Sequence, residues 1–144
     1  MRTERLLSSA DIDQTPGRPP GVCLSPGLPC VGDSVIIGVA GTSNPHAQSD
    51  LKRISVLLSA VLGDRVELAF AAIGDPTIPD AVAQARRRGA RRVVVASYLL
   101  SDGLFQDRLR CSGADAVAEP LGTHPAMVRL IASRFRRARV PSHV

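Results

Sequence analysis

Aromatic side chains are scarce in this chain, which has no Trp, one Tyr and three Phe in 144 residues. Lysine is nearly absent as well, since 17 of the 18 basic residues are Arg, and the formal net charge is +5. A basic protein attracts polyanions in general. Proteins that bind nucleic acid, however, typically stack bases on aromatic side chains or carry a known reader motif. We therefore do not expect nucleic acid as a partner.

Long apolar runs and an even set of cysteines are also lacking. No run approaches the ~18–20 apolar residues that span a bilayer, and residues 1–17 contain no apolar core of a secretory signal. The odd number of three Cys argues against a disulfide framework and for a reducing compartment. We expect a cytoplasmic protein that has no membrane partner.

Proline is concentrated in one part of the chain, because five of the eleven prolines lie within residues 1–33. Glycines are interspersed among them, and no period of 2 or 3.6 survives there. Proline removes backbone donors and glycine adds backbone entropy. We predict an irregular or disordered lead-in over residues 1–33, an α/β domain over residues 34–140 and a tail over residues 141–144.

From residue 34 onward, apolar strand patterns alternate with amphipathic helix patterns. Short apolar runs predict strands at 34–40, 65–70, 92–100 and 114–118. Helical spacing of apolar residues predicts helices at 51–62, at 79–88, at 104–111 and from 125 onward. This strict alternation predicts an α/β fold, a single (βα)₄ unit whose four-stranded parallel sheet carries helices on both faces.

Ligands of such sheets bind beyond the carboxyl ends of the strands, which draws attention to the first and third loops. The first loop, Ala40 to His46, contains small residues and hydroxyls before a helix. This pattern favours an anion, or equally an ordinary turn with a helix cap. In the third loop, Leu104 and Phe105 stand near the mouth of the site or pack under the next helix. No GxGxxG or GxxxxGK[ST] string is present, so nucleotide-binding motifs are absent.

Three strings carry a family resemblance: Gly41-Thr42-Ser43-Asn44-Pro45 after the first strand, Ala90–Val95 leading into Tyr98-Leu99-Leu100, and Pro120–Ala126 before the last helix. With these strings, about residues 34–139 resemble the sirohydrochlorin chelatase family. Members of that family insert cobalt or iron into a tetrapyrrole on the way to cobalamin or siroheme. The resemblance implies a chelatase-like fold, a lyase activity, Co²⁺ or Fe²⁺ as substrate, and a tetrapyrrole with eight carboxylates.

The two histidine positions of the family are occupied here by Ala40 and Phe105. In active members these imidazoles are thought to hold the metal and to accept the pyrrole protons, roles that suit neutral imidazole but neither a methyl nor a phenyl group. The two loops resemble the second, histidine-less copy of long members that fuse two units. The resemblance thus implies a degenerate half with no catalytic residue. Alternatively, it implies a structural or binding partner of a histidine-bearing half, or a gene remnant.

Binding of the acidic tetrapyrrole is expected at the first and third loops, where helix N-termini and nearby Arg would attract carboxylates. The candidate ligand-binding residues are Gly41, Thr42, Ser43, Asn44, Ser101, Gly103 and Arg108. Arg110 is a further candidate. The arginine run at 86–92 is expected to be a solvated face on the opposite edge of the sheet.

No cluster of His, Cys and carboxylate emerges, so we expect neither a structural metal nor a bound cofactor. His46 and His124 are expected in capping or turn roles, and Cys111 as a buried thiol. The C-x₆-C spacing of Cys23 and Cys30 is not a usual zinc spacing. A single (βα)₄ unit this small leaves apolar surface exposed on a face or an edge, which a second such unit would normally cover. We therefore expect a homodimer, or a histidine-bearing chelatase half as partner.

Overall fold

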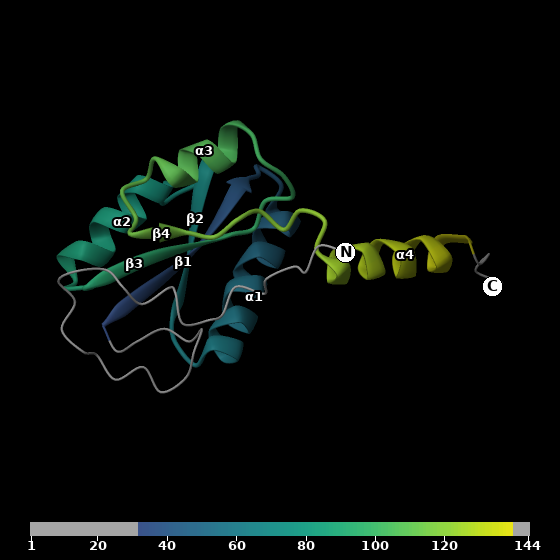
Figure 1. The fold of residues 1–144 in the computed structure, drawn as a ribbon, viewed down its shortest axis with the longest axis horizontal. Coiled ribbons are helices and arrows are strands. Elements are labelled where there is room, and N and C mark those ends of the chain that lie inside the picture. The colour runs from purple at the N-terminus through teal and green to yellow at the C-terminus, as the bar shows by residue number, and fades with distance from the viewer. Residues whose placement is uncertain (1–31, 140–144) are drawn as a thin grey trace, which may run out of the picture.

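The computed structural model describes residues 32–139, which form the predicted alternation of strands and helices (Figure 1). The strands are β1 (Asp33–Gly41), β2 (Val66–Ile73), β3 (Arg92–Ser97) and β4 (Ala116–Val117). The helices are α1 (Pro45–Leu62), α2 (Ile78–Arg87), α3 (Leu104–Arg110) and α4 (Pro125–Arg139). All strand pairs are parallel, and the prediction of a (βα)₄ unit is confirmed.

The strand order is β2-β1-β3-β4, so the first strand, β1, lies inside the sheet between β2 and β3. The second strand, β2, is added on one side of β1, and the third strand, β3, is added on the other side. The order therefore reverses between β1 and β3, where ligands of open α/β sheets bind. The backbone N–H of Tyr98 donates to the carbonyl of Gly38 at 2.9 Å, which joins the two strands at this point.

Helices cover both faces of the sheet, as predicted, and each face has its own apolar cluster. On one face α1 packs over β1 and β2; the buried residues there are Val35, Ile37, Val39, Val66 and Phe70. On the other face α2 and α3 pack over the sheet, and this cluster includes Ile36, Ile78, Val82, Val93, Val95 and Leu109. Successive residues 35–39 of β1 are all buried because they alternate between the two clusters, whereas burial itself alternates along β3; both patterns follow from the period of two in a strand.

Element boundaries differ from the predictions where polar side chains act on the backbone. The first helix begins at Pro45, six residues before the predicted start, because the side chain of Asn44 caps it. Gly63 ends this helix in a left-handed conformation with φ of 70°. The third strand ends at Ser97 rather than at residue 100, since the N–H of Leu99 donates to the Ser97 hydroxyl.

Part of the sequence prediction is wrong or lies outside the described residues. Cys111 is exposed rather than buried. It follows the last residue of α3, where Leu109 already occupies the buried position. The lead-in lies outside the described residues apart from its last two positions, of which Asp33 begins β1. The tail with His143, and both Cys23 and Cys30, lie outside them altogether.

The last helix, α4, stands apart from the rest of the fold. In Figure 1 it extends away from the sheet, and none of its residues is buried. No helix between residues 32 and 139 is long and apolar enough to cross a membrane.

Candidate functional site

The structure brings Ala40 and Phe105 to the same edge of the sheet, the one formed by the carboxyl ends of the strands. Leu109 lies against Gly38 so closely that a Cβ on Gly38 would be 2.8 Å from its Cδ2 atom. Phe105 precedes Leu109 by one helical turn of about 5.4 Å. Ala40 follows Gly38 by two strand residues, about 6.6 Å. Both displacements, from Leu109 to Phe105 and from Gly38 to Ala40, run toward the carboxyl ends of the strands. Phe105 and Ala40 therefore lie at a similar height along the strand direction.

Ala40 points toward α3 rather than toward α1. It alternates with Val39, which belongs to the cluster under α1, and it packs against the cluster that contains Leu109. A side chain at position 40 is thus directed to the space beside the first turn of α3. That turn carries Phe105, whose side chain is 39% exposed.

Arg108 lies next to these two positions. Its guanidinium carbon is 5.7 Å from the centre of the Phe105 ring, and its Nη1 donates to the carbonyl of Ala71 at 2.9 Å. Ala71 belongs to β2, on the far side of β1 from β3. The Arg108 side chain therefore reaches across the end of β1, and a positive charge stands beside Ala40.

Gln106 is a positioning residue that the sequence reading missed. It is 1% exposed; its Oε1 accepts a hydrogen bond from the Ser97 hydroxyl at 2.7 Å, and its Nε2 donates to the carbonyl of Ala118 at 3.0 Å. These bonds tie α3 to the end of β3 and to the segment after β4. A glutamine in the first turn of a short helix gives no sign of burial in the sequence; only its inward position reveals the role.

The first loop is organised by its own hydrogen bonds. The Oδ1 atom of Asn44 accepts from the N–H groups of His46 at 2.9 Å and Ala47 at 3.5 Å. The Oγ1 atom of Thr42 accepts from the N–H of Asn44 at 3.1 Å. The sequence analysis expected N–H groups of this loop to be available to an anion. In the structure they are already hydrogen-bonded to side chains of the loop itself. Ser43 is exposed, and its role in binding stays a prediction.

Gly41 is required by the backbone at the end of β1. Its φ is +108°, and a Cβ there would overlap the carbonyl oxygen of Ile73 on β2. The absence of a side chain lets the end of β1 pass directly beside β2. This role is structural, and any contact of Gly41 with a ligand stays a prediction.

The third loop encloses a shallow hollow at the same edge. Its lining runs from Leu99 to Gln106 and includes Ser101 and Gly103, and its volume is about 180 Å³. The positive charge of Arg110 is not available to a ligand in this hollow, because Arg110 forms ion pairs with Asp102 at 2.7 Å and with Glu119 at 3.1 Å. The side-chain hydrogen bond that Arg110 donates to Asp102 is the main reason why the pKa of Arg110 is raised.

Arg108 differs from Arg110 in its charge environment. No carboxylate within residues 32–139 lies within ion-pair distance of Arg108. Among the described residues, its one hydrogen-bond acceptor is the neutral carbonyl of Ala71. Of the two arginines that follow the third loop, Arg108 is the one whose charge remains available to an anionic ligand.

The two described histidines lie at the beginnings of two different helices, α1 and α4. His46 lies in the first turn of α1, and the Nδ1 atom of His124 accepts from the N–H of Ala126 at 3.2 Å. In the part of the chain that the structure describes, no three His, Cys, Asp or Glu side chains are grouped so that they could hold a metal ion.

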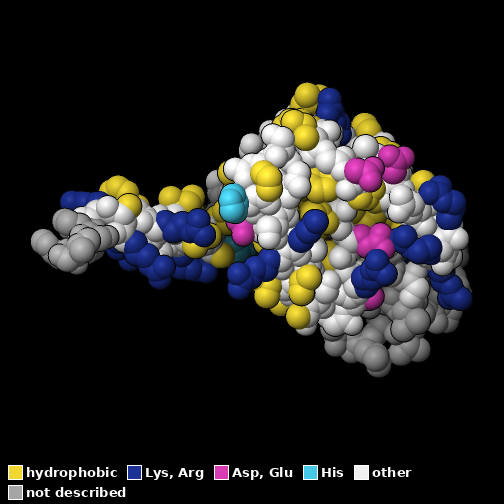
Figure 2. Space-filling model, turned by 180° about the vertical axis from the view of Figure 1, so that it is seen from behind, with side chains coloured by type: hydrophobic (Ala, Val, Ile, Leu, Met, Phe, Trp, Pro, Cys, Tyr) yellow, Lys and Arg dark blue, Asp and Glu magenta, His cyan; other side chains and the backbone are white. Residues whose placement is uncertain are grey.

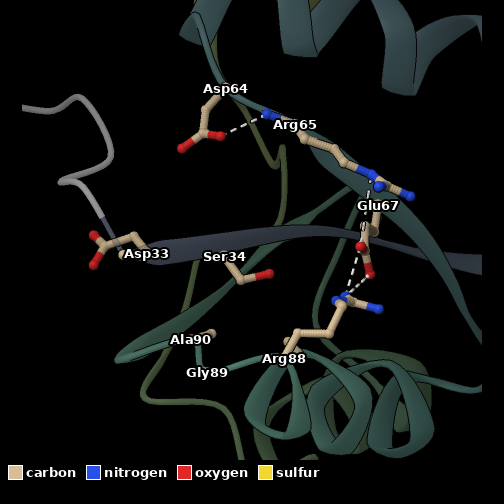
Figure 3. A pocket seen from close by; sticks show the side chains of 10 residues that line it. Asp33, Ser34, Asp64, Arg65, Glu67, Arg88, Gly89 and Ala90 are labelled. Carbon is tan, nitrogen blue, oxygen red and sulfur yellow. Dashed lines mark hydrogen bonds and ion pairs between the residues drawn. The ribbon is translucent and has the colours of Figure 1, made fainter.

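A second hollow lies at the opposite edge of the sheet, at the amino ends of the strands (Figure 3). Its volume is about 260 Å³, and its lining includes Asp33, Asp64, Arg65, Glu67 and Arg88. Arg88 binds both oxygens of Glu67, at 2.6 and 2.7 Å. Acidic groups outnumber basic ones in this lining, so the larger hollow is a poor site for a polyanion.

Two arginines of the exposed run at 86–92 are paired with carboxylates. Besides the contact between Arg88 and Glu67, Arg86 pairs with Asp115 at 2.9 Å. The run does lie at the amino edge, away from Arg108, as the sequence predicts. Arg86 and Arg88 therefore link the end of α2 to the residue before β4 and to β2, respectively.

The sequence model of the CbiX family matches residues 34–138. A curated relative, a sirohydrochlorin cobaltochelatase from Priestia megaterium, is 34% identical over 82 residues, which cover 56% of this chain and 27% of that protein. The match thus spans about a quarter of the relative's length. A solved structure from Marinobacter aquaeolei VT8, named as a cobalamin (vitamin B12) biosynthesis CbiX protein, has a TM-score of 0.58 at 17% identity. It covers 74% of this chain and 96% of that one, and this likeness shows the shared fold.

Proposed function

Because this chain belongs to the CbiX family, we propose that it serves metal insertion into a sirohydrochlorin-like tetrapyrrole as a degenerate half. In this role it binds the carboxylates of the tetrapyrrole and supplies no metal ligand of its own. A histidine-bearing half supplies the imidazoles that hold Co²⁺ or Fe²⁺ and accept the pyrrole protons.

The chemistry around Ala40 is the observation that carries this proposal. A methyl group, a phenyl ring and a guanidinium stand together where the family resemblance places two imidazoles. None of the three can donate a lone pair to a metal at neutral pH, and the guanidinium repels a divalent cation. The same guanidinium attracts a carboxylate, with which it can form two parallel hydrogen bonds.

The size of the hollow supports a half rather than a complete site. Pockets that enclose a small molecule usually measure about 300–1,000 Å³. The hollow at the third loop has about 180 Å³, and the first loop is closed by its own hydrogen bonds. One chain therefore presents a single surface to a tetrapyrrole, and a second surface must face it to exclude water.

The residues of this chain have defined tasks in the proposal. Arg108 binds a carboxylate, and its bond to the Ala71 carbonyl keeps it over the end of β1. Gln106 holds α3 in register, so that Arg108 and Phe105 stay at the edge. Gly41 lets the end of β1 approach β2, because a Cβ there would overlap the carbonyl of Ile73.

Titration with metal-free sirohydrochlorin tests the binding step. We expect its absorption spectrum to shift on mixing with the full chain, and Arg108→Gln to weaken binding about tenfold, the loss of one charged hydrogen bond. Arg110→Gln is the matched control, since Arg110 is already neutralised by acids, and it should leave the affinity unchanged. Melting temperatures of both variants show whether the fold is intact.

Metal insertion is then measured with Co²⁺ added to the same mixture. We expect the isolated chain to insert cobalt no faster than buffer does. Turnover by the chain alone would refute the degenerate half. Absence of any spectral shift, with the protein folded, would refute tetrapyrrole binding and favour a purely structural partner of a histidine-bearing half, or a gene remnant.

A further inference from the structure

The second half of α1 is apolar on the side that faces away from the sheet. Residues 54–62 include no charged side chain, and Leu58 packs inward against the cluster over β1 and β2. Three outward side chains are strongly exposed: Val56 at 66%, Leu57 at 58% and Val61 at 77%. These three residues form the outer patch of α1.

The exposed helix α4 provides a contrast, because its apolar side chains are accompanied by charges. It stands clear of the globular part in Figure 2 and carries arginines beside an exposed apolar stripe of Val128, Ile131 and Phe135. The outer patch of α1 has no charged neighbour within residues 54–62. A helix segment that is apolar on all sides is typically buried, and an exposed apolar patch often marks a contact surface. The outer patch therefore has the character of a contact surface.

The described chain begins close to the end of this half of α1. The carbonyl of Gly32 accepts a hydrogen bond from the N–H of Arg91 at 2.9 Å, and Asp33 then begins β1, the strand over which α1 packs. Gly32 and Asp33 line the hollow at the amino edge together with Asp64 and Arg65, which follow α1 (Figure 3). Position 32 therefore lies at the same end of the sheet as the last turn of α1.

The stretch that precedes Gly32 in the sequence is apolar and uncharged. Residues 22–31 contain no charged side chain, and they include Val22, Leu24 and Leu28. Two prolines in the same stretch lack the backbone N–H that a strand needs to pair with a sheet. This composition favours contact through apolar side chains rather than through the backbone.

We infer that residues 22–31 lie against the outer patch of α1 and cover it. Ten residues in an extended conformation reach about 31 Å, at about 3.1 Å per residue. The helix from Val56 to Val61 is only about 9 Å long, at about 1.5 Å per residue. The segment is thus long enough to run from the amino edge of the sheet to the far end of the patch. This inference does not depend on the tetrapyrrole.

Attachment at Gly32 favours this segment over a separate protein. A segment joined to the fold by a few residues meets the patch at an effective concentration on the order of millimolar. Burial of apolar side chains from both sides stabilises the contact, and proline reduces the number of conformations that the free segment loses on docking. An apolar contact too weak to hold a second molecule is therefore populated within one chain.

The native cysteines report on this contact in the full chain. Cys23 and Cys30 belong to the segment, whereas Cys111 is exposed. We expect N-ethylmaleimide to label Cys23 and Cys30 at least about tenfold more slowly than Cys111, because a covered thiol reacts slowly. Each rate is divided by the rate of the same thiol in concentrated urea, and peptide mass mapping assigns the labels. Equal normalised rates for the three thiols would overturn the inference.

A charge placed in the outer patch should release the segment. Leu57→Asp changes an exposed side chain, so the fold is retained, and a cooperative melting curve verifies this. We expect it to raise the labelling rates of Cys23 and Cys30 to that of Cys111. Ser49→Asp is the matched control, because it adds the same charge to an exposed position in the first half of α1 and should leave the rates unchanged.

Two further outcomes would contradict this contact. If labelling of Cys23 and Cys30 is slow but Leu57→Asp does not change it, the segment packs elsewhere and the inference is overturned. If all three thiols react alike and Leu57→Asp lowers the particle mass measured by light scattering, a second copy of the chain covers the patch instead.

Discussion

Replacing Gln106 by leucine tests what holds α3, with Phe105 and Arg108, at the edge of the sheet. The carboxamide is 1% exposed and makes two hydrogen bonds, to the Ser97 hydroxyl at 2.7 Å and to the carbonyl of Ala118 at 3.0 Å. Leucine has a similar volume, so the change removes the hydrogen bonds without opening a large cavity.

The magnitude follows from the groups that lose a partner. A group left buried without a hydrogen bond costs about 1–3 kcal/mol. The Ser97 hydroxyl keeps the N–H of Leu99 as a donor but loses its acceptor, and the carbonyl of Ala118 loses its donor. Leucine recovers part of this loss through its own burial. We therefore expect a net loss of about 2–3 kcal/mol, a large share of the 5–15 kcal/mol that stabilises a typical domain.

Urea denaturation of the full chain measures this loss as a shift of the midpoint at constant slope. Ser97→Ala alone and combined with Gln106→Leu completes a double-mutant cycle, and we expect a coupling of about 1 kcal/mol between the two sites. A loss below about 0.5 kcal/mol, or strictly additive effects, would refute the view that this pair fixes α3.

Three further outcomes test the site and its frame. Changing Ala40→His and Phe105→His together should create a Co²⁺ site, since both positions share one edge; the absence of a cobalt absorption band above that of the parent protein would contradict this geometry. Asp115→Asn should lower the melting temperature at pH 7. Burial raises the pKa of Asp115, but hydrogen bonds from Arg86 and a backbone N–H outweigh it and bring the pKa below its ordinary value of 3.8. The carboxylate therefore stabilises the fold above that pH, so the difference between variant and parent should shrink as the pH falls through the lowered pKa; a constant difference would argue against the charge. Gly41→Ala should cost at least about 2 kcal/mol in urea denaturation, because φ is +108° and the new Cβ meets backbone; a neutral effect would contradict the close approach of β1 to β2.

Local sequence was sufficient for the order and type of the helices and strands between residues 33 and 139. Continuous apolar runs such as residues 34–40 are typical of strands buried on both faces, and Gly63 ends the first helix as predicted, because these signals act over a few neighbouring residues. That Ala40 and Phe105 occupy the positions where the family resemblance implies imidazoles remains a prediction from the sequence. Boundaries were less predictable, because the cap at Asn44 and the hydroxyl of Ser97 decide them.

Contacts between residues far apart in the sequence determined where the candidate site lies and which polar residues are buried. Strand order set the edge at which Ala40, Phe105 and Arg108 meet, and the bond from Arg108 to Ala71 joins residues 37 positions apart. Gln106 has the composition of a surface residue and is buried only because α3 crosses β3. The apolar stripe of α4 predicts a helix with a partner, but the sequence does not say which surface that partner offers. Hydrophobic periodicity in the sequence indicates which residues are buried, but it does not indicate what they pack against. The packing partners depend on which surfaces the folded chain places next to each other.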